Sequence, residues 1–352
     1  MKIKDLVRPE VLNLKPYVPA TKVLDKVRLN ANESPYSVTK SASNDALNLY
    51  PDARPDQIRE KVASYLSLSS ENIVVTRGST EAIDVAIRTF CIPNQDGILV
   101  FPPTFEMYKF YAEVQGIEMH TILLDDENEY SLDMSAIKAF NSKNAKLTFI
   151  CSPSNPLGHK FSDESIYQVC EHFSDSGLVI LDGAYVEFDD DEIYKTILSK
   201  FDNVVILRTL SKAFGLAGVR CGVLISSSEI CQFIERVIPP YSFSTPAVNA
   251  VLESLSDKGI EESRRNIKTI IQDREWLMKE LESLDEVIKV FPSYTNFVLV
   301  KVKDAKSFCK KSKDIGFLLR DVGYQPLLEN CVRITVGTTK QNQKLIKGIK
   351  DE

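Results

Sequence analysis

The chain has 352 residues, and its 43 Lys and Arg against 49 Asp and Glu give a formal net charge of −6. An ordinary globular composition of 43% hydrophobic and 26% charged residues excludes a disordered or collagen-like chain, and the length suggests about two domains. The acidic balance argues against nucleic-acid binding, and the sequence shows neither an apolar run of membrane-spanning length nor an apolar leader after Met1, so we expect a cytoplasmic protein without a membrane partner.

Residues 1–40 are interrupted by four prolines, at positions 9, 16, 19 and 35. Proline breaks helices, so this segment is predicted to be an irregular N-terminal arm. We expect the arm to pack with the smaller of two domains.

Residues 41–248 alternate short apolar runs with helical patterns. Several runs are almost continuously apolar, which is typical of strands that are covered by helices on both faces. The pattern predicts an α/β large domain with a mostly parallel seven-stranded sheet. The seven predicted strands are 73–75, 98–101, 117–122, 146–151, 178–181, 204–207 and 221–225.

Residues 249–352 read as a smaller α+β domain. A long polar helical pattern comes first, and strands and a further helix follow it. The predicted helices are 253–284 and 305–313, and the predicted strands are 287–290, 296–302 and 332–336.

The sequence offers little for metal, thiol or nucleotide chemistry. Its seven cysteines include no C-x-x-C pair, and its three histidines show no metal-ligand spacing. The motifs G-x-G-x-x-G, G-x-x-x-x-G-K-[ST] and G-x-S-x-G are all absent. We therefore expect no metal site.

Polar residues follow three of the predicted strands, at the sheet edge where α/β proteins place ligands. Lys212 lies in a loop of small residues after strand 204–207, between Ser211 and Arg220, which could both bind an anion. Partial burial and a nearby cation would lower the lysine pKa and leave it nucleophilic. Asp182 ends strand 178–181, and S-P-S-N-P-L-G follows strand 146–151.

These motifs carry a family resemblance. The set S-P-S-N-P-L-G, D-G-A-Y and S-K-A-F-G-L-A-G-V-R resembles the pyridoxal-phosphate aminotransferases of fold type I. Further segments resemble the histidinol-phosphate aminotransferases within that family, and the matches run in order from about residue 28 to 338. They are R-L-N-A-N-E-S-P at 28–35, Y-P-D at 50–52, P-P-T-F-E-M-Y at 102–108, L-R-D at 319–321 and V-R-I-T-V-G at 332–337.

The resemblance implies roles around the cofactor ring. Lys212 would form the Schiff base with pyridoxal phosphate and then act as acid and base in the proton shift. Asp182 would pair with the protonated pyridine nitrogen and keep the ring an electron sink. Asn155 and Tyr185 would bind the phenolate oxygen of the ring, and Phe105 would stack on its face.

A second set of roles concerns the cofactor phosphate. Ser211 and Arg220 would bind it together with main-chain N–H groups at a helix start. Tyr50 would reach the phosphate bound by a partner subunit, which implies a homodimer with shared active sites. The helix start comprises Gly78, Ser79 and Thr80.

The substrate roles fall to the C-terminal part and the arm. Arg333 would bind the substrate anion as a planar fork, and Arg320 with Asn30 would add contacts to a phosphate. The implied activity exchanges the amino group of L-histidinol phosphate with 2-oxoglutarate, giving imidazole acetol phosphate and L-glutamate in histidine biosynthesis. An aromatic amino-acid aminotransferase or a threonine-phosphate decarboxylase of the same fold is the alternative, and a non-catalytic cofactor-binding protein is a more distant one.

Two positions depart from the family pattern. Gly183 stands where the motif D-E-A-Y has glutamate, and Leu157 stands where N-P-T-G has threonine. We expect catalysis to survive both, because the residue at 183 flanks the aspartate and a lost hydroxyl at 157 removes at most a supporting hydrogen bond worth about 1 kcal/mol.

Overall fold

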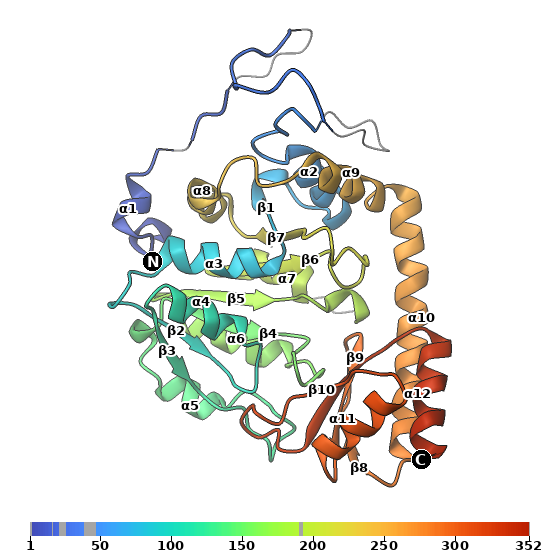
Figure 1. Cartoon of the computed structure of the whole chain (residues 1–352). Coiled ribbons are helices and arrows are strands. Elements are labelled where there is room, and N and C mark those ends of the chain that lie inside the picture. Colours follow the sequence, from blue (N-terminus) through green and yellow to red (C-terminus); the bar gives the residue numbers. More distant parts are fainter. Residues whose placement is uncertain (1, 16, 21–25, 39–46, 190–192, 352) are drawn as a thin grey trace.

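Two sheets of unequal size organise the chain (Figure 1). The computed structural model describes residues 2–15, 17–20, 26–38, 47–189 and 193–351. None of the helices within these ranges is long and apolar enough to cross a membrane.

The larger sheet has seven strands in the order β1-β7-β6-β5-β4-β2-β3. Strand β7 runs antiparallel to its neighbours β1 and β6, and the other pairs are parallel. The predicted mostly parallel seven-stranded sheet is therefore confirmed. Its strands are β1 (Ile73–Thr76), β2 (Gly97–Val100), β3 (Glu118–Thr121), β4 (Leu147–Cys151), β5 (Leu178–Asp182), β6 (Val204–Thr209) and β7 (Gly222–Ile225).

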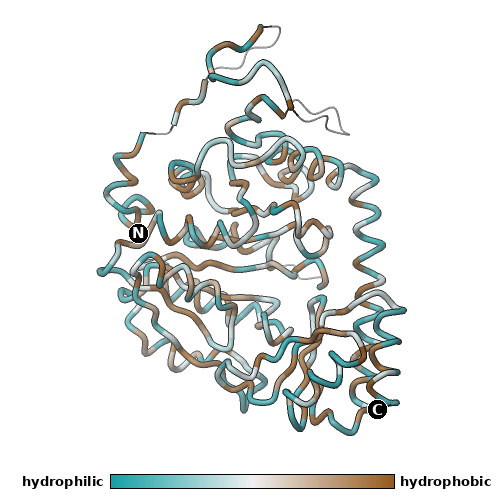
Figure 2. The backbone as a smooth tube through the Cα atoms, in the orientation of Figure 1, coloured by the Kyte–Doolittle hydropathy of each residue, from teal (hydrophilic) through white to brown (hydrophobic). Residues whose placement is uncertain are grey.

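Helices cover both faces of this sheet, because the central strands are apolar on both sides. Along β5, Val179 and Leu181 join the core on one face, while Leu178 and Ile180 join the core on the other. In Figure 2 this strand is brown along most of its length. One face carries α3 (Ser79–Phe90), α4 (Met107–Val114) and α8 (Ser228–Val237), and the other carries α2 (Asp56–Leu66), α5 (Met134–Ala139), α6 (Asp163–His172) and α7 (Ile193–Lys200).

The smaller sheet is antiparallel, in the order β10-β11-β9-β8, and packs against helices around a core of its own. The predicted helix 253–284 covers the last two residues of one helix and the whole of the next, because the Ser256 side chain accepts a hydrogen bond from Gly259 N (3.2 Å) and starts the second helix. The predicted boundary at 248/249 lies inside the first of them, and the exact division remains a prediction. The elements are α9 (Thr245–Ser254), α10 (Asp257–Glu282), β8 (Val287–Val290), β9 (Phe297–Val302), α11 (Ala305–Asp314), β10 (Arg320–Asp321), β11 (Cys331–Thr335) and α12 (Thr339–Asp351).

The N-terminal residues pack on the large domain, not on the small one. The short helix α1 (Pro9–Leu12) places Val11 in the same apolar core as α3 and α8. Arg8 N donates to Thr89 O (3.0 Å), and the Arg236 side chain donates to Leu12 O (3.0 Å). The expectation that the arm packs with the small domain is therefore wrong for this stretch, while residues 21–25 and 39–46 lie outside the described ranges.

Candidate active site

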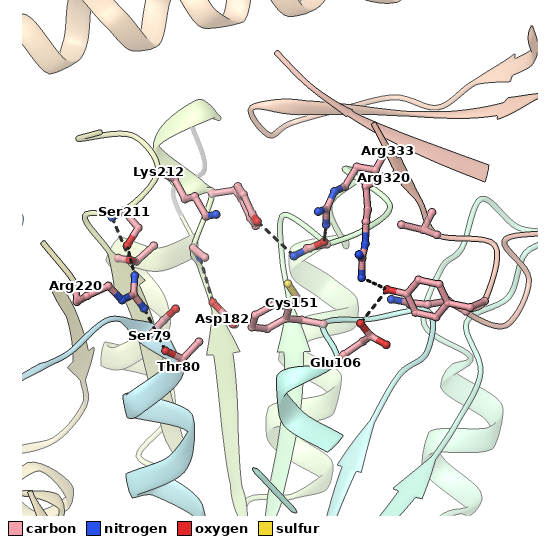
Figure 3. A pocket seen from close by; sticks show the side chains of 18 residues that line it. Ser79, Thr80, Glu106, Cys151, Asp182, Ser211, Lys212, Arg220, Arg320 and Arg333 are labelled. Carbon is pink, nitrogen blue, oxygen red and sulfur yellow. Dashed lines mark hydrogen bonds between the residues drawn. The ribbon is translucent and has the colours of Figure 1, made fainter. Parts of the chain in front are cut away.

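A cavity of about 440 Å³ lies at the carboxyl ends of β4, β5 and β6, where the small sheet meets the large one (Figure 3). This is the edge at which the sequence placed the candidate side chains. The residues that line it are Ser79, Thr80, Phe105, Glu106, Cys151, Asn155, Asp182, Ala184, Tyr185, Thr209, Ser211, Lys212, Arg220, Arg320, Val322, Tyr324, Gln325 and Arg333.

Lys212 enters the cavity from the loop that follows β6, with its Nζ 5.7 Å from the centre of the Tyr185 ring. The side chain is open to the cavity, but the surrounding protein atoms displace part of its hydration shell. This loss of hydration lowers the pKa of Lys212, and the charges of Arg333 and Arg220 lower it further. A larger fraction of neutral amine results, which is the form that acts as nucleophile and base.

Asp182 closes the floor of the cavity at the end of β5, where it is 1% exposed. Its Oδ2 accepts a hydrogen bond from Tyr108 Oη (2.8 Å), and its Oδ1 accepts one from Ala184 N (3.2 Å). Burial raises the pKa of Asp182 to about 6, and the hydrogen bond from Tyr108 opposes that rise. A cationic ring nitrogen above this carboxylate would relieve the cost of burying its charge.

The raised pKa of Asp182 makes the stability of the cofactor-free chain depend on pH. Between about pH 4 and 6 the folded chain keeps a proton that the unfolded chain has released, so its stability falls as pH rises through this window. Asp182→Asn removes the titration and should gain about 2–3 kcal/mol relative to the parent between pH 4 and 7. Urea unfolding at both pH values measures the difference, and a pH-independent difference would contradict the assignment.

An anion cradle lies on the other side of Lys212, at the start of α3 (Figure 3). Gly78, the N-cap residue, has φ +81°, and a Cβ there would lie 2.7 Å from Arg220 Nη2. Arg220 donates to Ser211 Oγ (3.2 Å) and Thr80 Oγ1 (3.4 Å), so guanidinium, hydroxyls and the helix N-terminus converge. Such a combination favours a phosphate.

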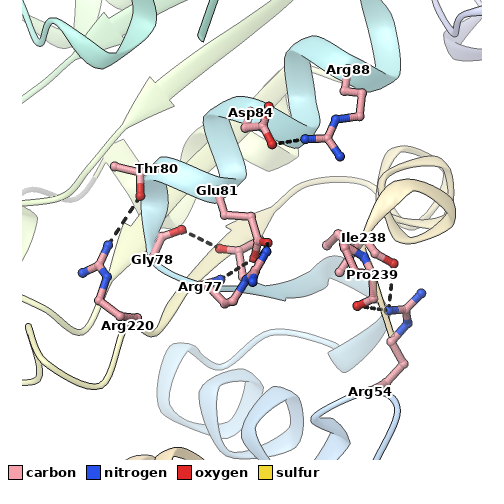
Figure 4. A network of polar contacts seen from close by, with 11 residues as sticks. Arg54, Arg77, Gly78, Thr80, Glu81, Asp84, Arg88, Arg220, Ile238 and Pro239 are labelled. Atoms are coloured by element: carbon pink, nitrogen blue, oxygen red, sulfur yellow. Dashed lines mark hydrogen bonds and ion pairs between the residues drawn. The ribbon is translucent and has the colours of Figure 1, made fainter. Parts of the chain in front are cut away.

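The charges around the start of α3 are arranged so that Arg220 is the cation that faces the cradle (Figure 4). Arg77 is engaged by Glu81, which accepts bonds from its backbone N (2.6 Å) and its Nε (2.8 Å). The carboxylate of Glu81 also stabilises the first turn of the helix. Arg77 accordingly does not line the cavity.

Asn155, Tyr185 and Arg333 form a continuous chain of contacts on the small-domain side of Lys212. Asn155 Nδ2 donates to Tyr185 Oη (3.3 Å), and its Oδ1 accepts from Arg333 Nη1 (2.6 Å). Arg320 stands opposite Arg333 in the β10–β11 register, which brings both guanidinium groups to the cavity. The structure thus brings predicted residues from both sheets together around one cavity.

Three predicted residues do not line this cavity: Gly78, which lies behind Arg220 in the cradle, and Tyr50 and Asn30, which lie apart from it. Tyr50 is 52% exposed and packs its ring against Tyr241, with 5.0 Å between centroids, and Asn30 is exposed. Phe105, by contrast, lines the cavity as expected.

Several residues at the site were not predicted from the sequence. Tyr108, which holds Asp182, belongs to the segment 102–108 that carried the resemblance, so the motif contained the signal although no role was drawn from it. Glu106 and Tyr324 line the mouth and bond to each other, with Tyr324 Oη donating to Glu106 Oε2 (2.8 Å). No spacing in the sequence links positions 218 residues apart.

The two departures from the family pattern have structural reasons. A Cβ at Gly183 would lie 2.6 Å from Tyr194 Cε1, and Tyr194 Oη donates to the Ser152 carbonyl at the end of β4. Tyr194 thus occupies the space that a side chain at 183 would need. Leu157 is 1% exposed and belongs to the main core, so an apolar residue fits there.

Gly183→Ala should lower the free energy of unfolding by about 1–3 kcal/mol, because the methyl group overpacks against Tyr194. Gly218→Ala is the matched control, since a Cβ at that glycine meets nothing within 4 Å. Chemical unfolding of both variants measures the effect. Equal free energies of unfolding for the two variants would contradict the prediction, because they would mean that the Tyr194 ring can shift without loss of stability.

The chain is similar to known aminotransferases over almost its whole length. The family model for aminotransferase class I and II matches residues 9–349. Histidinol-phosphate aminotransferase of Yersinia enterocolitica is 37% identical over 349 residues, which cover 99% of this chain and 92% of that protein. The crystal structure of histidinol-phosphate aminotransferase from Clostridium acetobutylicum matches with a TM-score of 0.78 at 24% identity, covering 87% of this chain and 90% of that one. The enzyme from Sinorhizobium meliloti, solved in complex with pyridoxal-5'-phosphate, matches with a TM-score of 0.75 at 22% identity, covering 87% and 84%.

Proposed function

The chain belongs to the class I and II aminotransferase family, and we propose that it transfers the amino group of L-histidinol phosphate to 2-oxoglutarate, giving imidazole acetol phosphate and L-glutamate in histidine biosynthesis. The observation that supports this most is the pair Arg320 and Arg333, which stand opposite each other across two strands and face the cavity that holds Lys212. Two guanidinium groups beside a reactive amine suit a substrate that carries both an amine and a phosphate.

The residues present fit pyridoxal phosphate as the cofactor. The cradle formed by Gly78, Thr80, Ser211 and Arg220 suits its phosphate, and buried Asp182 suits its ring nitrogen. Asn155 and Tyr185 would hold the ring oxygen, Phe105 would lie against the ring, and main-chain N–H groups of Ser79 and Thr80 would complete the phosphate contacts. When bound, the cofactor supplies an electron-withdrawing ring that weakens the Cα–H bond of the substrate amine.

The chain itself binds, orients and moves protons. Lys212, with its lowered pKa, takes the proton from the substrate Cα in the first half-reaction. In the second half-reaction it delivers a proton to the corresponding carbon of the oxo acid. Asp182, at the cavity floor, would balance the positive charge of the ring nitrogen. Arg333, fixed by Asn155, orients the substrate anion, and the same arginine holds the carboxylate of the oxo acid in the second half-reaction.

Substrate choice is tested by comparing amines on the purified holoenzyme. We expect kcat/KM for L-histidinol phosphate to exceed that for L-phenylalanine and for L-threonine phosphate. A preference for phenylalanine would indicate an aromatic amino-acid aminotransferase. Release of carbon dioxide from threonine phosphate would indicate a decarboxylase.

A homodimer with shared active sites is part of the proposal, as is a cytoplasmic location. Tyr50 does not reach the cavity of its own chain, and apolar side chains of the described arm are exposed. Val27, Leu29, Tyr36 and Val38 are 81–101% exposed, which is typical of a surface that another subunit covers.

Mixing two inactive variants tests the shared site. Tyr50→Ala lacks the group that would reach the partner's cofactor, and Lys212→Ala lacks the catalytic amine. A hybrid dimer contains one site in which both groups are intact, so exchange should restore up to about a quarter of parental activity by random pairing. Subunit exchange without any recovery would contradict the shared site.

A further inference from the structure

One carboxylate at the mouth of the cavity has no part in cofactor binding. Among the residues that line the cavity, the acidic ones are Asp182 and Glu106. Asp182 is buried at the floor, whereas Glu106 is exposed at the N-cap of α4 and lies on the side of Arg320 (Figure 3).

Glu106 is held by the small domain. Tyr324 Oη donates to Glu106 Oε2 (2.8 Å) and accepts from Arg320 Nη2 (3.3 Å), while the Arg320 guanidinium lies 5.6 Å from the centre of the Tyr324 ring. The one phenol proton of Tyr324 is donated to Glu106. Tyr324 therefore orients the Glu106 carboxylate, and Arg320 orients Tyr324. A carboxylate has about four lone-pair sites, so Glu106 retains capacity to accept further hydrogen bonds.

A carboxylate is an unexpected neighbour for an anion-binding arginine. Its charge opposes any phosphate or carboxylate that enters the cavity, and it therefore lowers affinity unless the substrate brings a donor to the same place. The imidazole ring of L-histidinol phosphate is such a donor, since it carries an N–H group and becomes cationic near pH 6.5.

We propose that Glu106, positioned by Tyr324, accepts a hydrogen bond from the imidazole ring of the substrate and so selects imidazole-bearing amines over phenyl-bearing ones. The inference rests on the proposed function and names the residue that sets its side-chain preference. A phenyl ring cannot donate a hydrogen bond. It would shield the Glu106 carboxylate from water without replacing the lost hydrogen bonds. A site built around such a bond rejects the analogue that lacks it.

The test compares L-histidinol phosphate with L-phenylalaninol phosphate, which shares the amine and the phosphate but lacks a ring N–H. Glu106→Ala should lower kcat/KM for the imidazole substrate by about 10- to 100-fold, mainly through KM, and leave the phenyl substrate unchanged or better. Glu106→Gln, which keeps a neutral acceptor, should lose less. The control Glu113→Ala removes an exposed carboxylate that lies farther along α4 and outside the cavity, and both substrates should be unaffected.

The pH profile provides a readout that general damage would not give. The preference of the parent enzyme for imidazole should grow between pH 8 and 6, as the ring gains its proton, and should stay flat in Glu106→Gln. Equal losses on both substrates, or no loss on either, would overturn the role of Glu106. The half-reaction with glutamate checks that the variants still fold and react. If the parent enzyme turned over neither phosphorylated amine, the proposed function would fall and this inference with it.

Discussion

Replacing Lys212 by alanine is expected to lower kcat by about 10⁴-fold, the largest loss of activity that any single substitution in this chain should cause. Its amine is the basic group that stands between the Asp182 floor and the Arg220 cradle, and both its position and its lowered pKa suit proton transfer. Cofactor fixed to the protein by borohydride reduction should also disappear, because the attachment point is gone. Steady-state rates and mass spectrometry of the reduced protein measure the two effects.

Two further substitutions separate chemistry from charge. Lys212→Arg keeps a positive charge, but a guanidinium has too high a pKa to give up its proton, so its loss should approach that of alanine. Lys306→Ala, at an exposed position on α11, should leave the rate unchanged. Residual activity of Lys212→Ala above about one per cent would mean that another group moves the proton.

Removing Arg208 is expected to cause the largest loss of stability, about 3–5 kcal/mol for Arg208→Leu. Arg208 Nη2 donates to Glu187 Oε1 (2.8 Å), and the two side chains are only 14% and 6% exposed. Glu187 lies in the 3₁₀ turn Val186–Phe188, directly after Tyr185, so the pair ties that turn to β6. Without the arginine, the ion pair is lost and Glu187 keeps a largely buried charge.

The double variant that lacks both charges is expected to be more stable than Arg208→Leu alone. Arg208→Leu with Glu187→Leu removes both charges and should recover most of the lost free energy of unfolding. Arg265→Leu is the control, because Arg265 pairs with Glu261 and Glu262 at sites more than half exposed, where water screens an ion pair and little stability is lost with it. Urea unfolding measures all three. Equal losses for Arg208→Leu and Arg265→Leu would show that burial does not decide the outcome.

The large sheet was predictable because all its strands except the edge strand β3 are buried almost throughout. Continuous apolar runs such as 147–151 and 178–181 leave little choice of structure, and polar residues at their ends mark the ligand edge. Lys212, Asp182, Asn155 and Arg220 could therefore be assigned to one site before their contacts were known.

Other features depend on contacts between segments that are distant in sequence. The two residues of β10 are too few for a hydrophobic period, and their pairing with β11 comes from tertiary packing. The packing of Val11 beside α8 follows from the apolar surface there, which the prolines of the arm do not reveal. Tyr194 and Tyr324 likewise acquire their roles only through contacts with Ser152 and Glu106.

Transfer of a labelled nitrogen tests the central claim most directly. The holoenzyme is given L-histidinol phosphate that carries ¹⁵N in its amino group, together with 2-oxoglutarate, and the products are followed by mass spectrometry. The site formed by Lys212, Asp182 and the two arginines predicts ¹⁵N-glutamate and imidazole acetol phosphate in equal amounts, with no labelled glutamate from the Lys212→Ala variant. Unlabelled glutamate, or consumption of the amine without formation of the ketone, would contradict the account.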